Sequence, residues 1–185
     1  MSLDYAILGF LNYQPYTGYD LKKVFDVSIR HFWPADQSQI YRTLSRLAES
    51  GWVVMEKVPQ DDRPDRKVYH ITAAGRAELL RWVSGPPPLG DPRSAVLIQV
   101  FFLGQLSDEE ILNKFESYAT IMRAILSQYD QAEDRLGSSN QKPPSAREYF
   151  FWTLTLENGI RNMRANLEWA EYVIECVKTG RVPQV

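Results

Sequence analysis

One segment, residues 36–72, constrains the fold most, because an amphipathic helix there runs directly into two alternating strands. Asp36 and Gln39 have the spacing of a capping box, which is typical of a helix N-terminus. Gly51 is placed to end the helix, since glycine readily adopts the left-handed conformation that follows many helices. Between these signals, apolar residues recur at helical spacing and form one stripe: Ile40, Leu44, Leu47 and Ala48.

The opposite face of this helix, predicted over residues 37–50, carries side chains suited to DNA contact. Gln, Ser, Thr and Arg side chains donate hydrogen bonds to phosphates or read base edges. This set contains no carboxylate, which phosphates would repel. The residues predicted for this role are Gln37, Ser38, Gln39, Arg42, Thr43 and Arg46.

The two strands are predicted over residues 52–58 and 67–72, on either side of a polar connection rich in Pro and Asp. A helix followed by a β-hairpin with a basic arm is typical of a winged helix-turn-helix. In that fold the helix enters the major groove and the wing contacts the backbone or minor groove. The candidate wing cations are Arg63, Arg66 and Lys67. The alternative is that these cations are solvated and partly neutralised by neighbouring aspartates.

The first 84 residues also carry a set of short motifs: Gly18-Tyr19-Asp20-Leu21, Phe32-Trp33, Ile40-Tyr41, Arg46-Leu47, Arg66-Lys67-Val68-Tyr69 and Ile71-Thr72-Ala73-Ala74-Gly75. As an ensemble they resemble the winged-helix domain of the PadR family of bacterial transcriptional regulators. The family often has proline after the tyrosine of the recognition helix, whereas this chain has Arg42. The resemblance supports phosphate contact by Lys67 and at least one wing arginine.

Two further helices precede the recognition helix. The first is predicted over residues 3–11, and Thr17 caps the second, with Asp20 at the capping-box position. Tyr19 lies in the first turn, where its hydroxyl could meet a phosphate near the helix N-terminus. The alternative is a packed ring with its hydroxyl in water. After the wing, Thr72 caps a helix that ends at about residue 83.

Residues 84–88, Ser-Gly-Pro-Pro-Pro, read as a linker. We therefore predict a DNA-binding domain over 1–84, a linker over 85–90 and a helical dimerisation domain over 91–185. In the last domain Asp91 and Pro92 predict a helix start, although residues 96–102 could also form a buried strand. Ser107 and Ser145 are predicted to cap two long helices. The predicted fold class is thus mainly α, with a winged helix-turn-helix followed by an α-helical domain.

Both long helices show apolar residues at alternating spacings of four and three, the pattern of helices packed lengthwise. Such seams can pair with each other, with a second copy, or with both. Further apolar residues lie off the seams, including Ile121, Phe150 and Phe151, and a partner subunit would cover them. We therefore predict a homodimer, with these seam residues at its interface: Phe115, Tyr118, Met122, Ile125, Tyr149, Trp152, Leu156, Ile160, Met163 and Leu167.

Composition narrows the function. The net charge is −2, so non-specific binding to nucleic acid should be weak. No apolar run is long enough for a membrane span, and the single cysteine, Cys176, excludes an intrachain disulfide. We expect a cytoplasmic protein without membrane contact. No nucleophile, base or phosphate loop has catalytic spacing, so we predict no enzyme activity, no cofactor and no metal.

The main hypothesis is a dimeric repressor that binds a near-palindromic operator in double-stranded DNA. The PadR resemblance adds a small hydrophobic or phenolic effector as a further partner. Two alternatives come from other classes. Winged helices also serve as protein-binding adaptors, and the chain could instead be a ligand sensor without DNA binding.

Overall fold

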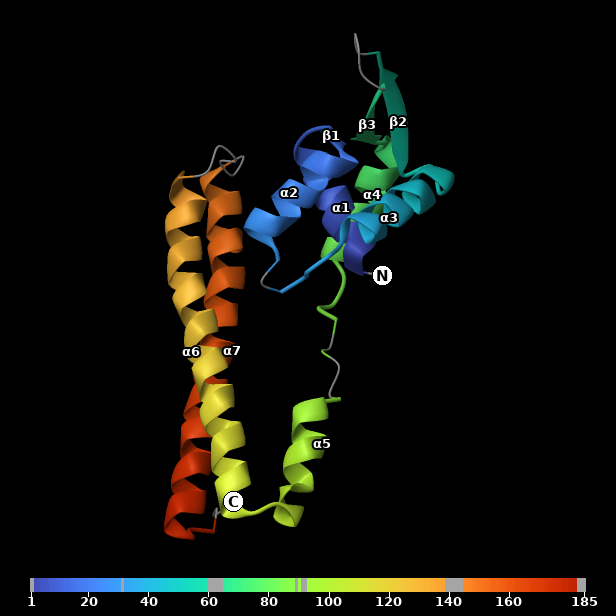
Figure 1. Ribbon diagram of the computed structural model, residues 1–185. Helices are drawn as coiled ribbons and strands as arrows, with labels where there is room; N and C mark the ends of the chain where they lie inside the picture. Colours follow the sequence, from blue (N-terminus) through green and yellow to red (C-terminus); the bar gives the residue numbers. More distant parts are fainter. Residues whose placement is uncertain are drawn as a thin grey trace. The chain divides into compact units, whose positions relative to one another are not determined.

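The computed structural model describes residues 2–30, 32–59, 65–88, 90, 93–138 and 145–182, with the backbone alone for 130–138 (Figure 1). The chain divides into two compact units, the first of which holds the chain up to Pro88. The second holds the helices from residue 95 onward. Within the described ranges, no helix is both long and apolar enough to cross a bilayer.

The first unit contains four helices and a small antiparallel sheet, whose strands β2 and β3 extend beyond the helices (Figure 1). Its elements are α1 (Ser2–Tyr13), β1 (Tyr16–Thr17), α2 (Gly18–Ser28), α3 (Gln37–Glu49), β2 (Val53–Val58), β3 (Arg66–Ile71) and α4 (Ala73–Val83). The strand order is β1-β3-β2, so the wing strands β2 and β3 carry an additional short strand. The core is built from the apolar faces of α1, α2 and α3 and the base of the wing.

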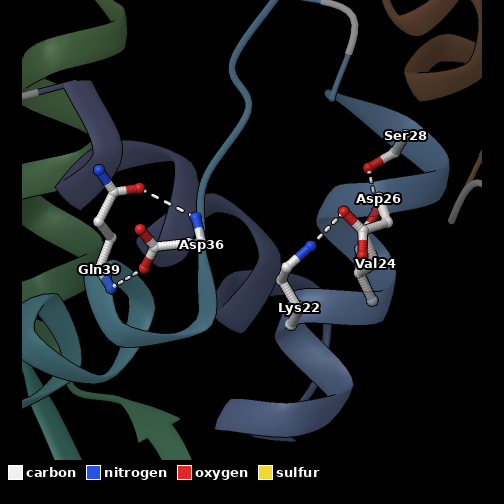
Figure 2. A network of polar contacts seen from close by, with 6 residues as sticks. All are labelled: Lys22, Val24, Asp26, Ser28, Asp36 and Gln39. Atoms are coloured by element: carbon white, nitrogen blue, oxygen red, sulfur yellow. Dashed lines mark hydrogen bonds and ion pairs between the residues drawn. The ribbon is translucent and has the colours of Figure 1, made fainter.

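The predicted helix signals of this unit are confirmed. The backbone N–H of Gln39 donates to Asp36 Oδ1 over 2.7 Å, and the N–H of Asp36 donates to Gln39 Oε1 over 2.9 Å (Figure 2). Both halves of the capping box at α3 are therefore formed. Thr17 and Thr72 cap α2 and α4. Gly51 follows α3 at a φ of 71°, a left-handed conformation that favours glycine.

The second unit is helical. It comprises α5 (Ala95–Phe101), a 3₁₀ turn η1 (Leu103–Gln105), α6 (Asp108–Ser138) and α7 (Ala146–Thr179). Ser107 and Ser145 cap the long helices as predicted, since their hydroxyls accept from the backbone of Glu110 and Glu148. The strand alternative for residues 96–102 is wrong, because most of this segment is α5. Asp91 and Pro92 lie outside the described residues, and α5 is instead capped by Ser94.

Helices α6 and α7 pack lengthwise against each other as an antiparallel pair (Figure 1). Arg123 pairs with Glu171 over 2.5 Å, and Lys178 pairs with Glu116 over 3.1 Å. The residue numbers of α7 therefore fall as those of α6 rise, as they do in an antiparallel pair. Val100 of α5 and Leu103 pack on the same cluster as Phe115 and Ala170. The seam predicted from heptad spacing therefore closes largely within one chain.

Candidate nucleic-acid interface

The first turns of α3 present an exposed polar surface. Gln37, Ser38, Gln39 and Arg42 are all exposed, and residues 37–48 include no carboxylate. Gln39 already accepts the N–H of Asp36 with its side-chain oxygen, so its amide N–H₂ group is the part that can still donate. Reading adenine with both atoms of the amide would require the capping box to open. Gln39 therefore suits donation to a base or phosphate acceptor.

Arg42 extends from the exposed face of α3. Its Nε donates only a long bond of 3.4 Å to the Ser38 carbonyl, and it has no ion pair within the described ranges. The terminal nitrogens of its guanidinium remain available, and a guanidinium can bind guanine or phosphate in bidentate fashion. Among the side chains predicted for the reading face, Arg42 is thus the cation best placed for recognition.

Thr43 was predicted for the same face, and that placement is wrong. Only 6% of its surface is exposed, beside Leu44 and Leu47 on the buried side of α3. Position 43 lies three residues after Ile40 and four before Leu47, which is the spacing of the apolar stripe itself. A β-branched threonine therefore completes the core stripe of α3.

Arg46 has a structural partner. Its Nη2 forms an ion pair with the carboxylate of Asp4 in α1, and Asp4 is a buried residue with 6% of its surface exposed. A buried carboxylate needs such a partner, since an unpaired charge away from water is costly. Half of the Arg46 side chain remains exposed. We infer that Arg46 joins α1 to α3 first, and that its part in DNA contact is secondary.

A close contact sets the approach of α2 to α3. A Cβ atom at Gly18 would come within 2.7 Å of Tyr41 Cζ, so only glycine leaves room for the aromatic ring. Gly18 is buried at the start of α2, whereas Tyr41 is partly exposed in α3. The paired motifs of the sequence, Gly18-Tyr19 and Ile40-Tyr41, therefore meet in space.

Tyr19 occupies the first turn of α2 and is 55% exposed, so its side chain is accessible to DNA. The ammonium of Lys23 lies 4.4 Å from the centroid of its ring, within reach of a cation–π contact. Lys23 was not predicted as a site residue. Its position one turn after Tyr19 on the helix was the available signal.

The wing carries two lysines directly opposite each other. In the antiparallel pair β2–β3, Lys57 aligns with Lys67, and both side chains are exposed. Opposed residues of antiparallel strands point to the same face, where like charges repel. A phosphate between or beside them would relieve that repulsion. Lys57 was missed from the sequence because this alignment depends on the register of the hairpin.

Arg66 and Lys67 point to opposite faces of the wing, since side chains alternate along a strand. Arg66 Nη2 pairs with Asp20 Oδ2 of α2 over 2.8 Å. On the same strand His70 pairs with Glu56 of β2 over 2.9 Å. Arg63, the third predicted wing cation, lies outside the described residues. Of the predicted wing cations that the structure describes, Arg66 and Lys67, only Arg66 has an ion pair in the described ranges.

Several residues predicted at a dimer interface are buried inside their own chain. Phe115, Met122 and Leu156 expose less than a tenth of their surface, so they pack within one chain, and contact with a second copy at these three positions stays a prediction. Tyr149 is exposed, and the others are partly buried along α6 and α7: Tyr118, Ile125, Trp152, Ile160, Met163 and Leu167. The exposed apolar side chains are mostly others: Val96, Leu97, Ile98, Phe101, Phe102, Leu106, Ile121, Phe150, Phe151 and Leu154.

Comparison with known proteins agrees with this geometry. Residues 7–81 match the transcriptional regulator PadR-like family, and residues 92–178 match the virulence activator alpha C-term family. A probable transcriptional regulator of Mycobacterium tuberculosis, Rv1176c, is 33% identical over 98% of this chain and 100% of its own length. The negative transcriptional regulator PadR of Bacillus subtilis is 26% identical over 95% of this chain and 97% of its own length.

Solved structures give the same result for the fold. The structure of B. subtilis PadR in complex with operator DNA has a TM-score of 0.82 and 26% identity, with 96% of this chain and 99% of that chain covered. The Vibrio cholerae virulence activator AphA has a TM-score of 0.75 and 26% identity, with 96% and 98% covered. The predicted fold class and the family resemblance are both confirmed. The chain belongs to the transcriptional regulator PadR-like family.

Proposed function

We propose that this protein is a sequence-specific DNA-binding regulator that acts on a near-palindromic operator as a homodimer. The observation that supports it best is the exposed surface of the first turns of α3, which offers Gln37, Ser38 and Arg42, whereas the helix's own carboxylate, Glu49, comes only in its last turn. The same fold, in B. subtilis PadR, was solved in complex with operator DNA. In this proposal α3 enters the major groove, where Arg42 reads a base and Gln37 and Ser38 contact base edges or phosphates.

The wing supplies backbone contacts in the same proposal. Lys57 and Lys67 share one exposed face, so a phosphate there would bind two cations at once. Tyr19 and Lys23 at the start of α2 add a hydroxyl and an ammonium near a helix N-terminus, which favours anions. Each of these contacts positions the protein on DNA without reading its sequence.

A homodimer follows from the apolar surface of the second unit. Phe101 of α5 is 82% exposed, and Leu97, Ile98 and Phe102 near it are more than half exposed. A contiguous apolar surface of this kind marks an interface, and two-fold symmetry covers it with its own copy. Two recognition helices would then read half-sites roughly 10 or 20 base pairs apart. Repression is the direction we propose, because the Bacillus subtilis relative is named a negative regulator.

The effector is a further part of the proposal. B. subtilis PadR, 25% identical to this chain over 95% of it, was also solved in complex with p-coumaric acid. We propose that a small phenolic acid releases this protein from its operator. Titration with p-coumaric acid should quench tryptophan fluorescence and dissociate the operator at the same concentration. Quenching without release would instead support the sensor that lacks DNA binding.

Catalysis is not part of the proposed function. Membership of a family of transcriptional regulators supports the expectation that the chain is not an enzyme. Within the part of the chain that the structure describes, no three His, Cys, Asp or Glu side chains gather as metal ligands would. Localisation in the cytoplasm also remains our proposal, and access to DNA requires it in a bacterial cell.

The test is a selection of DNA duplexes from a randomised library on the purified protein at about 150 mM salt, a concentration at which non-specific binding is weak. Recovery of a shared inverted repeat would support a DNA-binding dimer. Recovery of a single half-site would support DNA binding but count against the two-fold arrangement. Recovery of unrelated sequences, with a shallow salt dependence, would favour the protein-binding adaptor over a DNA-binding regulator.

A further inference from the structure

Three elements of the first unit meet at the start of α2. The hydroxyl of Thr17 accepts the backbone N–H of Asp20 over 3.0 Å and donates to Asp20 Oδ2 over 2.7 Å. Arg66 of β3 donates to the same carboxylate oxygen over 2.8 Å. Thr17 also belongs to β1, where it aligns with Val68 of β3. The base of the wing is therefore tied to α2 both through its backbone and through one ion pair.

This junction is also where α2 is fixed on the recognition helix. Gly18, between Thr17 and Asp20, lies against the ring of Tyr41 in α3. Any change in the angle between the wing and α2 would therefore change the angle between the wing and α3. Because the wing and α3 must reach DNA together, this geometry bears directly on specific binding.

Asp20 also affects the charge that the wing presents to DNA. Partial burial opposes ionisation of Asp20, but the hydrogen bond from Thr17 and the pairing with Arg66 outweigh it and lower its pKa. The carboxylate is therefore ionised at neutral pH and offsets the charge of Arg66. Lys67, on the opposite face of the strand, has no such partner in the described ranges.

We propose that Asp20 is a positioning residue that holds the wing at the angle operator binding needs and neutralises Arg66, so that random DNA binds weakly. The inference rests on the proposed function, since it concerns how the same surface discriminates between DNA sequences. Arg66 thereby changes from a predicted phosphate contact to a wing anchor. Lys67, with Lys57 opposite it, carries the phosphate contacts of the wing.

Asp20→Asn is the informative substitution. Asparagine keeps the size of the side chain and an oxygen that can accept from Thr17, but it removes the negative charge that holds Arg66. The wing then loses its ion pair to α2, which weakens the operator complex. The freed Arg66 becomes available to phosphates of any sequence, which strengthens binding to random DNA.

A matched control lies on the same helix. Lys22 and Asp26 form an exposed ion pair further along α2 (Figure 2), and within the described part of the wing neither residue has a bonding partner. Asp26→Asn makes the same change in net charge and also releases one cation. The double variant Asp20→Asn/Arg66→Gln also removes the freed cation, so it tests whether Arg66 causes the added binding to random DNA.

The experiment measures the affinity of the full chain and these variants by fluorescence anisotropy. The probes are the duplex that the wild type recovers from a randomised library and a shuffled duplex of equal length. Asp20→Asn should lower the ratio of the two affinities at least about fivefold, the scale of one lost specific contact. On shuffled DNA, the slope of log affinity against log salt concentration should become steeper by about 0.9, the contribution of one added phosphate contact. The double variant should return shuffled-DNA affinity to the wild-type level.

The affinity ratio separates positioning from loss of folded protein, because an inactive fraction weakens binding to both duplexes by the same factor. Asp26→Asn should leave the ratio unchanged. An unchanged ratio in Asp20→Asn would overturn the inference, as would shuffled-DNA affinity that stays raised in the double variant. If the wild type itself does not prefer the recovered duplex, the proposed function fails as well. If it does and Asp20→Asn keeps that preference, only the inference fails.

Discussion

Arg46 of the recognition helix is paired with Asp4, a buried carboxylate of the first helix, across 42 positions of sequence. The pair joins α1 to α3 and gives the arginine a role in holding the helix in place. A residue that looks like a DNA contact in sequence can therefore be required for the fold.

Arg46→Ala should lower the free energy of unfolding by about 1–3 kcal/mol, because it leaves the Asp4 carboxylate buried without a partner. The exposed half of Arg46 keeps the expected loss below that of a fully buried pair. Urea denaturation measures it. Arg42→Ala is the control on the same helix and should stay within about 0.5 kcal/mol of the wild type. Equal stability of the two variants would show that the Asp4 pair contributes nothing.

Lys57→Glu should raise stability and weaken DNA binding at the same time. It replaces a like-charge pair across β2 and β3 with an opposite-charge pair, which is worth about 0.2–1 kcal/mol on a sheet. It also removes a wing cation, so affinity for operator and shuffled DNA should fall together. Thermal unfolding and anisotropy give the two results. A variant that binds DNA as the wild type does would remove the β2 lysine from the proposed interface.

Gly18→Ala should destabilise the first unit, although alanine is the better helix former by about 1 kcal/mol. The added Cβ would overlap the ring of Tyr41, and the partly exposed ring would have to move away from the buried start of α2, which we expect to cost about 1–3 kcal/mol. Adding Tyr41→Leu should recover part of the loss, because the smaller side chain frees the space. A gain in melting temperature from Gly18→Ala alone would contradict the tight approach of α2 to α3.

The ion pair at Asp20 should make a small acid-dependent contribution to stability. Burial raises the pKa of this carboxyl, but the bonds from Thr17 and Arg66 lower it overall, below its ordinary value of 3.8. A group whose pKa is lowered by folding stabilises the protein above its ordinary pKa and loses that effect as pH falls through the folded-state pKa. The wild type should therefore exceed Asp20→Asn in unfolding free energy at pH 7 and lose that advantage as pH falls below 3.8 and through the folded-state pKa. A difference that persists in acid would point to shape, not charge.

Two phenylalanines of the second unit should respond oppositely to substitution. Phe101→Glu places a charge on the exposed surface of α5 and should convert the dimer to monomers that keep their helix content. Phe115→Ala empties a site inside the α6–α7 pair and should cost about 3–5 kcal/mol of stability. Light scattering after gel filtration, with circular dichroism, separates the two effects. If neither variant becomes monomeric, the dimer interface does not involve α5.

Local signals in the sequence predicted most of the fold. Asp36 with Gln39, Ser107 with Glu110 and Gly51 act within one turn of chain, so the spacing of the residues is enough to identify the ends of helices. The short strand β1 was not predicted, because two residues show no periodicity and pair only through β3. The start of α5 was placed too early for a related reason, since Ser94 and Asp91 are both good caps.

The site was less predictable because its key contacts join residues far apart in sequence. Asp20 meets Arg66 and Asp4 meets Arg46 only after the helices pack, so both arginines looked free for DNA. The alignment of Lys57 with Lys67 required the hairpin register. Burial of Thr43 was within reach of the sequence, because its spacing from Ile40 and Leu47 follows the apolar stripe. Its hydroxyl had suggested a contact that its position excludes.

The most direct test compares wild-type protein and Arg42→Ala on the duplex selected from a randomised library and on a shuffled duplex. If Arg42 reads a base from the exposed face of α3, its loss should cost about 1–3 kcal/mol on the selected duplex. Binding to shuffled DNA should change far less. Equal losses on both duplexes would reduce Arg42 to a phosphate contact. No loss on either would contradict the assignment of α3 as the recognition helix.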